Sequence, residues 1–165
     1  MGVMTAALSA SSSPPLQTVN RVDLNRYIGK WYEIARYPNR FEKDCVSDVA
    51  AHYSLRDDGK IKVVNSCRKQ NGEVKESKGT AKVVDINSNA KLKVTFFWPF
   101  YGDYWVIGLD SDYRYAVISE PDRKYLWILS RTPQMAPELY EQALDSVRKQ
   151  GLDPSRLIKP LQSAK

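Results

Sequence analysis

Eight short segments rich in strand-forming residues, separated by brief polar turns, follow one another between residues 31 and 131. Two of these turns contain Asp-Gly or Asn-Gly, the pairs that tight hairpins favour. Sequential strands of this number predict an all-β fold, an eight-stranded up-and-down antiparallel β-barrel. The predicted strands span residues 31–37, 46–56, 60–68, 74–85, 91–97, 103–110, 113–119 and 124–131.

The hydrophobic period changes from strand-like to helical after the last predicted strand. A C-terminal helix is predicted from Pro137, which suits a first helical turn, to Gly151, which suits a helix end. Its apolar residues fall on one stripe, so the helix is expected to pack on the outside of the barrel. These residues are Tyr140, Ala143, Leu144 and Val147. A short strand near 156–159 is expected to pair back onto the sheet.

The chain has 165 residues, the size of one ordinary domain. Residues 1–19 carry no charge and include a Ser-Pro linker, which predicts a disordered tail or the remnant of a signal peptide. The choice between the two stays open, because signal peptides begin with basic residues and no Lys or Arg precedes Arg21 here. No cysteine follows the apolar run, so a lipid-anchored lipoprotein is not expected from the sequence as written. Residues 20–165 form the predicted domain.

Twenty-five Lys and Arg against nineteen Asp and Glu give a net charge of +6, which favours anionic partners without requiring them. Acidic and basic residues are interleaved over 40–44, which argues against a nucleic-acid surface. The one histidine, His52, neighbours an inward position and is expected to face solvent. The sequence has no hydrolase elbow, phosphate loop or metal-ligand spacing, so we expect no enzyme, metal or cofactor. Glu33, near the interior, is a candidate buried acid with a raised pKa.

Three short motifs occur in the order and spacing of the lipocalin family. They are Gly29-Lys30-Trp31 after the turn at 23–27, the stretch Asp110-Ser111-Asp112-Tyr113, and Arg131 at the end of the last predicted strand. The chain resembles lipocalins over residues 19–161. It is most similar to the subgroup of bacterial outer-membrane lipocalins, plant temperature-induced lipocalins and apolipoprotein D. This resemblance implies binding of fatty acids, lysophospholipids and similar lipids.

Trp31 and Arg131 are expected to close one end of the barrel. In an up-and-down barrel the first strand begins and the last strand ends at the same rim. The guanidinium can therefore stack on the indole and donate its remaining hydrogen bonds to the backbone of residues 23–28. We interpret a set of five residues as structural parts of this floor: Gly29, Trp31, Asp112, Tyr113 and Arg131.

The barrel interior is the predicted ligand site. Strand alternation puts Tyr53, Asn65 and Trp127 on inward faces, and the resemblance to apolipoprotein D implies that all three positions line a cavity. Further inward candidates are Val63, Leu92, Val94 and Phe96. The expected site is an apolar calyx with a few polar groups that carries a fatty acid or lysophospholipid. The alternative is a barrel filled by packed side chains.

The loop at 97–102 is expected at the opposite, open rim, and it is rich in aromatic residues. Trp98, Phe100 and Tyr101 beside cations suit a membrane surface, where aromatic rings lie at headgroup depth and cations meet phosphate. The expected cations are Arg40, Lys43, Arg68 and Lys69. The loop could instead fold inward as a lid, or bind protein as an interaction scaffold. The expected oligomeric state is a monomer or a homodimer.

Cys45 and Cys67 are expected near the same rim with their side chains on the same side, so a disulfide between them is geometrically sensible. A disulfide would indicate an oxidising compartment. The expected location is the periplasm or the outer-membrane surface, with the protein soluble as written. Secretion stays open, as does a cytoplasmic protein with two free thiols. Apolipoprotein D pairs its matching first cysteine elsewhere, so the pairing is not inherited from the resemblance.

Overall fold

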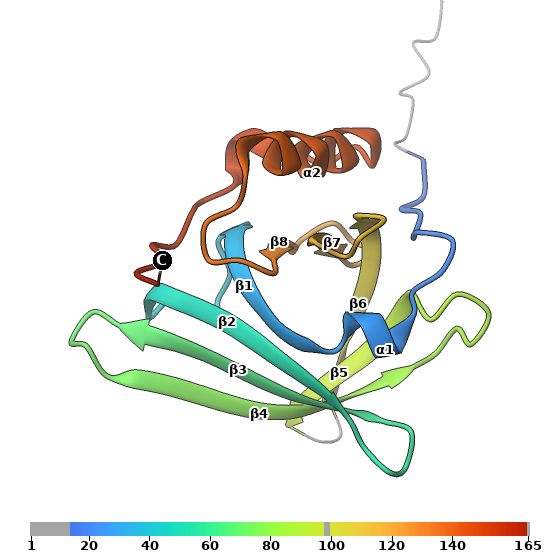
Figure 1. Cartoon of the computed structure of the whole chain (residues 1–165), viewed down its shortest axis with the longest axis horizontal. Helices are drawn as coiled ribbons and strands as arrows, with labels where there is room; N and C mark the ends of the chain where they lie inside the picture. Colours follow the sequence, from blue (N-terminus) through green and yellow to red (C-terminus); the bar gives the residue numbers. More distant parts are fainter. Residues whose placement is uncertain (1–13, 98–99, 165) are drawn as a thin grey trace, which may run out of the picture.

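The computed structural model describes residues 14–97 and 100–164 of the chain. Eight antiparallel strands close into one barrel in sequence order, and β8 pairs with β1 (Figure 1). The predicted fold class is therefore confirmed. The elements are α1 (Leu24–Tyr27), β1 (Gly29–Arg36), β2 (Cys45–Leu55), β3 (Ile61–Lys69), β4 (Val74–Val83), β5 (Lys91–Phe97), β6 (Phe100–Leu109), β7 (Tyr115–Ser119), β8 (Leu126–Ser130), α2 (Pro137–Lys149) and the 3₁₀ helix η1 (Pro154–Arg156).

The connections between strands alternate between the two ends of the barrel. Those joining β2 to β3, β4 to β5 and β6 to β7 lie at the end where β1 begins, together with α1, and we call this the closed end. Those joining β1 to β2, β3 to β4, β5 to β6 and β7 to β8 lie at the other end, which we call the open end. The connection between β5 and β6, which the sequence assigned to the open rim, is at that end.

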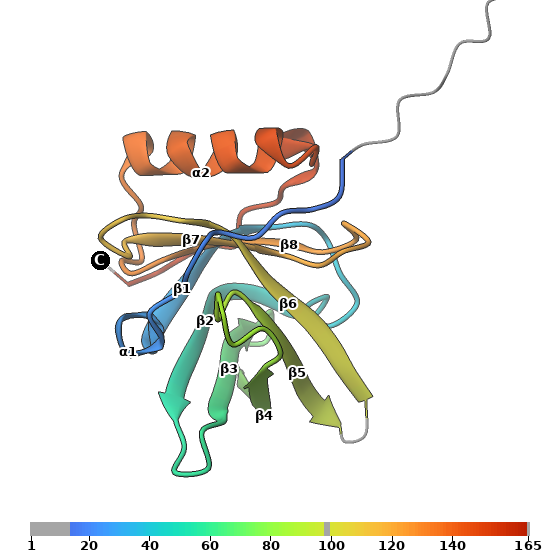
Figure 2. The same cartoon turned by 90° about the vertical axis from the view of Figure 1, so that its right-hand side faces the viewer.

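Helix α2 lies across the outside of the barrel, against β6 and β7 (Figures 1 and 2). Its residues Ala143, Leu144 and Val147 are buried in a cluster with Val117 and Ile128. All residues of β7 are buried, because the helix covers one face of the strand and the barrel interior covers the other. The predicted packing of this helix is confirmed.

The N-terminal segment differs from the predicted boundary after Val19. Leu16 is buried in the cluster beneath α2, and the amide of Val19 donates to the carbonyl of Val106 at 2.9 Å. The segment runs along the barrel toward α1 (Figure 2). Residues 14–19 therefore belong to the folded body, because α2 and the barrel together offer an apolar surface that buries Leu16. Residues 1–13 of the predicted tail lie outside the described part of the chain.

The C-terminal segment returns to the sheet, but by single bridges instead of the expected strand. Ile158 pairs with Arg36, and Leu161 pairs with Ser47. Several strand limits also differ from expectation by two or three residues: β1 begins at Gly29 rather than 31, β4 ends at Val83 rather than 85, β6 begins at Phe100 rather than near 103, and β8 begins at Leu126 rather than 124. Strand β7 begins after position 113 because Tyr113 adopts a turn conformation with φ of 59°.

A disulfide joins Cys45 to Cys67, with 5.5 Å between their Cα atoms. This confirms the predicted bridge. It ties the first residue of β2 to β3 at the open end, across a sequence separation of 22. In the chain-entropy account, closing a loop of this size stabilises the fold by about 3 kcal/mol.

A glycine in β4 allows an aromatic ring to lie inside the barrel. Gly79 pairs with the inward-facing Val63 of β3. A Cβ at Gly79 would lie 2.8 Å from two ring carbons of Phe96 and 2.6 Å from the carbonyl oxygen of Thr95. Rotation of the ring could relieve the first contact, but the second involves the backbone of a paired strand. The pairing of β4 with β5 therefore requires glycine at this position.

Gly79→Ala is expected to lower the free energy of unfolding by about 1–3 kcal/mol, the usual cost of inserting an atom into packed space. Gly102→Ala is the matched control, because nothing lies within 4 Å of a Cβ at that position. Urea denaturation followed by tryptophan fluorescence measures both variants. Equal stabilities of the two variants would contradict this account of β4.

Candidate ligand-binding site

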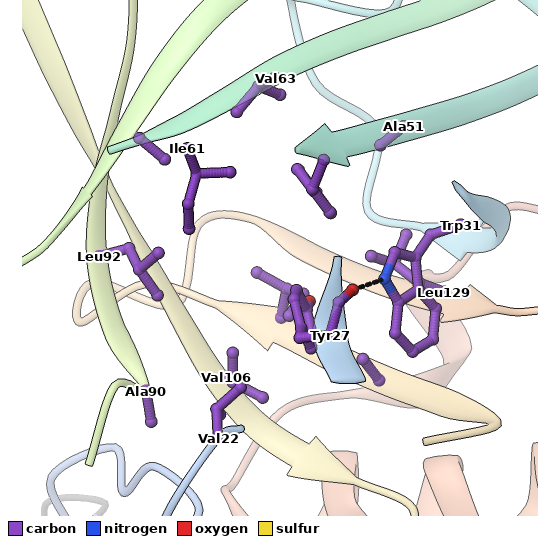
Figure 3. Close-up of a cluster of buried hydrophobic side chains, with 14 residues drawn as sticks. Val22, Tyr27, Trp31, Ala51, Ile61, Val63, Ala90, Leu92, Val106 and Leu129 are labelled. Atoms are coloured by element: carbon purple, nitrogen blue, oxygen red, sulfur yellow. Dashed lines mark hydrogen bonds between the residues drawn. The ribbon is translucent and has the colours of Figure 1, made fainter. Parts of the chain in front are cut away.

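Arg131 closes one end of the barrel. The carbon of its guanidinium lies 3.8 Å from the centre of the Trp31 ring. Its nitrogens donate to the backbone carbonyls of the segment that precedes and begins β1. These acceptors are Arg26 at 2.6 Å, Tyr27 at 3.0 Å, Ile28 at 3.1 Å and Lys30 at 3.0 Å. The indole nitrogen of Trp31 donates to the carbonyl of Tyr27 at 2.8 Å, as Figure 3 shows. The contact expected from the sequence is present, and its partners are all parts of the barrel.

The other residues assigned to the floor have different environments. Gly29 has φ of 108°, and a Cβ there would lie 3.3 Å from an Arg131 nitrogen. The hydroxyl of Tyr113 accepts the amide of Asp23 at 2.8 Å. Asp112 is exposed, and the acid that organises this turn is instead its neighbour Asp110, which accepts hydrogen bonds from Arg114. The sequence motif was located correctly, but Asp112 is not the carboxylate that holds it together.

Three tyrosines meet inside the barrel above the floor. The Tyr104 hydroxyl lies 2.5 Å from that of Tyr27 and 3.1 Å from that of Tyr53. Burial raises the pKa of Tyr53 to about 12 and raises the pKa of Tyr27 and Tyr104 above the ordinary value, so all three stay neutral. The sequence pointed to Tyr53 alone, because its two partners come from α1 and β6 and meet it only in the closed barrel.

A small cavity adjoins these tyrosines, with a volume of about 20 Å³. A volume of this size holds roughly one water molecule, so an alkyl chain does not fit in it. Its lining comes from α1 and several strands: Val22, Leu24, Tyr27, Ile28, Tyr53, Ile61, Ala81, Asn89, Leu92, Val94, Tyr104 and Val106. Val63 and Leu92 are buried members of the same hydrophobic cluster. The closed half of the barrel is therefore filled by packed side chains, which is the alternative that the sequence left open.

The open half of the barrel is different. Val94, Phe96 and Trp127 pack against the interior cluster, yet each keeps part of its surface accessible to solvent. Asn65 pairs with Ala51 and is also partly exposed. Four of the seven predicted ligand contacts are therefore inward-facing and less covered than Val63 and Leu92.

A buried charged cluster lies at the open end of this interior. Arg36, the last residue of β1, donates to a carboxylate oxygen of Glu33 at 2.9 Å and lies 3.5 Å from a carboxylate oxygen of Glu42. The Trp127 indole nitrogen donates to the other oxygen of Glu42 at 2.7 Å. Burial and the neighbouring Glu42 carboxylate raise the pKa of Glu33 well above the ordinary value. The sequence suggested Glu33 as a buried acid but gave no sign of Arg36 or Glu42.

The open rim exposes apolar side chains in or next to three separate connections. Phe41 is 55% exposed, Val74 61% and Phe97 81%. Arg40 lies over the ring of Phe41, with its guanidinium carbon 5.1 Å from the ring centre. Tyr101, also predicted for this rim, is 37% exposed. Trp98 and the side chain of Phe100 lie outside the described residues.

Two of the cations predicted for the rim are already paired. Arg68 donates to the carbonyl of Gly72 at 2.8 Å and to Asp48 at 3.4 Å. Lys69 lies 3.3 Å from Glu73. Gly72 and Glu73 lie in the turn of the β3–β4 hairpin, and Asp48 lies on the neighbouring strand β2. Arg68 and Lys69 are therefore partly neutralised locally.

Within the described ranges, no cluster of His, Cys, Asp and Glu is arranged to hold a metal ion. His52 is exposed on the outside of β2. No helix in the part of the chain that the structure covers is both long enough and apolar enough to cross a membrane.

Residues 22–162 match the lipocalin-like domain. The chain belongs to the lipocalin-like family. It is 46% identical over 152 residues to the outer membrane lipoprotein Blc of Citrobacter freundii, covering 90% of this chain and 85% of that protein. It is 42% identical over 156 residues to temperature-induced lipocalin-1 of Arabidopsis thaliana (90% and 83% covered) and 37% identical over 133 residues to apolipoprotein D of Bos taurus (76% and 68%). The subgroup expected from the sequence is confirmed.

The structure of insecticyanin from the tobacco hornworm Manduca sexta superposes on this lipocalin with a TM-score of 0.74 at 23% identity, covering 93% of each chain. That similarity concerns the fold. Membership in the lipocalin-like family supports the binding or transport of a small hydrophobic ligand, and it is consistent with a role other than catalysis.

The raised pKa of Glu33 has a measurable consequence for stability. The folded protein retains a proton that the unfolded chain releases as the pH passes the ordinary glutamate pKa. The free energy of unfolding is therefore expected to fall as the pH rises from that value toward the raised one. Glu33→Gln should remove this decline in urea denaturation at about pH 4 to 8, whereas Glu141→Gln on the exposed face of α2 should keep it. A decline that persists in Glu33→Gln would contradict the assignment.

Proposed function

We propose that this lipocalin binds and carries a single-chain lipid, a fatty acid or a lysophospholipid, in the open half of its barrel. The observation that carries the proposal is the set of inward side chains that remain accessible to solvent, including Val94, Phe96 and Trp127. A barrel used only as a scaffold would gain stability by filling this space.

The polarity of the interior supports one orientation of the lipid. Toward the closed end the walls are apolar, with Ile61, Ala81 and Leu92 around the small cavity. Toward the open end they carry Asn65 and the charged cluster around Arg36. An alkyl tail is best accommodated by the apolar walls toward the closed end, and a polar head group by the polar and charged groups toward the open end. The tail would therefore point to the tyrosines and the head group to the mouth.

The gain from tail burial is sufficient for useful affinity. Each buried methylene contributes roughly 0.8 kcal/mol, so a tail of about 16 carbons offers on the order of 12 kcal/mol before costs. Association and ordering of the chain cost several kcal/mol of this. Micromolar or tighter binding then needs few head-group contacts, and selectivity among tail lengths should be broad.

We further propose that the open rim meets a membrane surface, where such lipids are taken up or delivered. Phe41, Val74 and Phe97 are exposed together with Arg40, which suits insertion of apolar side chains beside anionic phosphates. The relatives named outer membrane lipoprotein and the disulfide between Cys45 and Cys67 support a location in an oxidising cell envelope.

Blocking the open half should abolish binding. Val94→Trp places an indole in the proposed tail site and is expected to weaken hexadecanoate binding at least about tenfold, because the tail loses its space. Val64→Trp is the matched control, since Val64 pairs with Lys78 and His52 on the outer face of the sheet. Displacement of a fluorescent fatty acid measures both. Unchanged binding by Val94→Trp would contradict the proposed position of the tail.

The membrane proposal is tested at the rim. Phe97→Ser is expected to reduce binding to vesicles of mixed neutral and anionic phospholipid by about tenfold, because burial of an exposed phenyl ring contributes on the order of 1.5–3 kcal/mol. Ile86→Ser is the matched control, since Ile86 is 83% exposed but lies in the β4–β5 connection at the closed end. Vesicle co-sedimentation measures binding of both variants. An equal loss of binding in the two variants, or no loss in either, would argue against contact through the open rim.

A further inference from the structure

The Glu42 carboxylate lies where two donors inside the barrel converge. The Trp127 indole donates to one of its oxygens at 2.7 Å, and an Arg36 guanidinium nitrogen lies 3.5 Å from the other. Arg36 is almost fully buried, with a side-chain exposure of 6%. A cation and a neutral N–H donor directed at one carboxylate are the elements of a carboxylate-binding site. In this structure the chain's own Glu42 occupies that site.

The charges of the cluster leave room for one anion. Burial and the neighbouring Glu42 carboxylate raise the pKa of Glu33, which favours its protonated, uncharged form in the folded protein. Arg36 then needs one buried counter-charge, and Glu42 supplies it. Another carboxylate could replace Glu42 without changing the net charge buried in the barrel.

The fit of Glu42 in the site is incomplete. The Nε atom of Arg36 is buried without a hydrogen-bond partner among the described residues. An unsatisfied buried donor is costly, and a ligand carboxylate that accepts from it would remove that cost.

The connection that carries Glu42 can release its side chain. Its turn is organised by Asn39, whose side-chain oxygen accepts the amides of Phe41 and Glu42 at 3.0 and 3.1 Å. These two bonds involve backbone amides, and one further bond, from the Asn39 side-chain nitrogen at 3.2 Å, reaches the Glu42 carboxylate. Release of the Glu42 side chain from Arg36 would break that one bond, while the two bonds to the backbone keep the shape of the turn.

We propose that Arg36 and Trp127 form a binding site for a fatty-acid carboxylate, and that Glu42 occupies it as an internal stand-in until the ligand displaces it. This inference rests on the proposed function, since the tail must lie in the open half of the barrel. It assigns the ligand class: a free carboxylate exchanges with Glu42, whereas a neutral alcohol or ester leaves Arg36 paired with Glu42.

The experiment compares two ligands of equal chain length, hexadecanoate and hexadecanol, by displacement of a fluorescent probe at neutral pH. Glu42→Gln removes the competing charge and nearly preserves the shape of the side chain. We expect about tenfold tighter binding of hexadecanoate and binding of hexadecanol within about twofold of the wild type, because the anion site is no longer occupied. Glu141→Gln on the exposed face of α2 is the control and should change neither affinity, because Glu141 lies outside the barrel interior.

A second measurement is made on the wild-type protein, and a variant serves only to assign the signal. In the wild type, the NMR signal of the Trp127 indole N–H should shift on saturation with hexadecanoate and not with hexadecanol; loss of the signal in Trp127→Phe assigns it. Equal effects of Glu42→Gln on both ligands, or equal shifts by both, would overturn the inference while leaving lipid binding intact. Failure of the wild type to bind either ligand would overturn the proposed function and this inference with it.

Discussion

The position of Arg131 over Trp31 is the interaction on which the rest of the structure depends. One guanidinium stacks on the indole and holds four backbone carbonyls of the segment entering β1. The barrel is thereby closed at one end by a residue of β1 and the residue that follows β8. Solvent and ligands can then approach the interior from the opposite end, which makes the inner surface of the open half the place where function has to be sought.

Along the barrel axis the interior changes from packed to accessible and from apolar to charged. The neutral tyrosine cluster and the small cavity lie toward the floor, and Arg36 with its two carboxylates lies toward the mouth. Burying charged groups is costly, so a protein that needed only stability would be expected to replace them by packed apolar side chains. The proposed ligand, with an apolar tail and an anionic end, would account for their presence beside Trp127.

Much of this architecture could be predicted from sequence, because strand alternation, tight turns and the Trp31–Arg131 pairing are local or follow directly from an up-and-down order. The disulfide followed from the same topology. Arg36 could not be found in this way: a bulge between Glu33 and Ala35 shifts the register of β1 against β8, so simple alternation places Arg36 on the wrong face. Glu42 and the tyrosine partners of Tyr53 were missed because their contacts join segments far apart in the chain. Leu16 was missed because its partners belong to α2.

The position of a bound tail tests the central claim most directly. NMR spectra of the protein with stearic acid that carries a nitroxide near its tail end should lose the signals of Leu92 and Ala81, which line the closed-end cavity. A nitroxide near the carboxylate should instead remove the signal of the Trp127 indole. If both probes act on the outer face, for example at Lys62 and Lys78 beside the surface hollow of about 360 Å³, the lipid does not enter the barrel and the account is wrong.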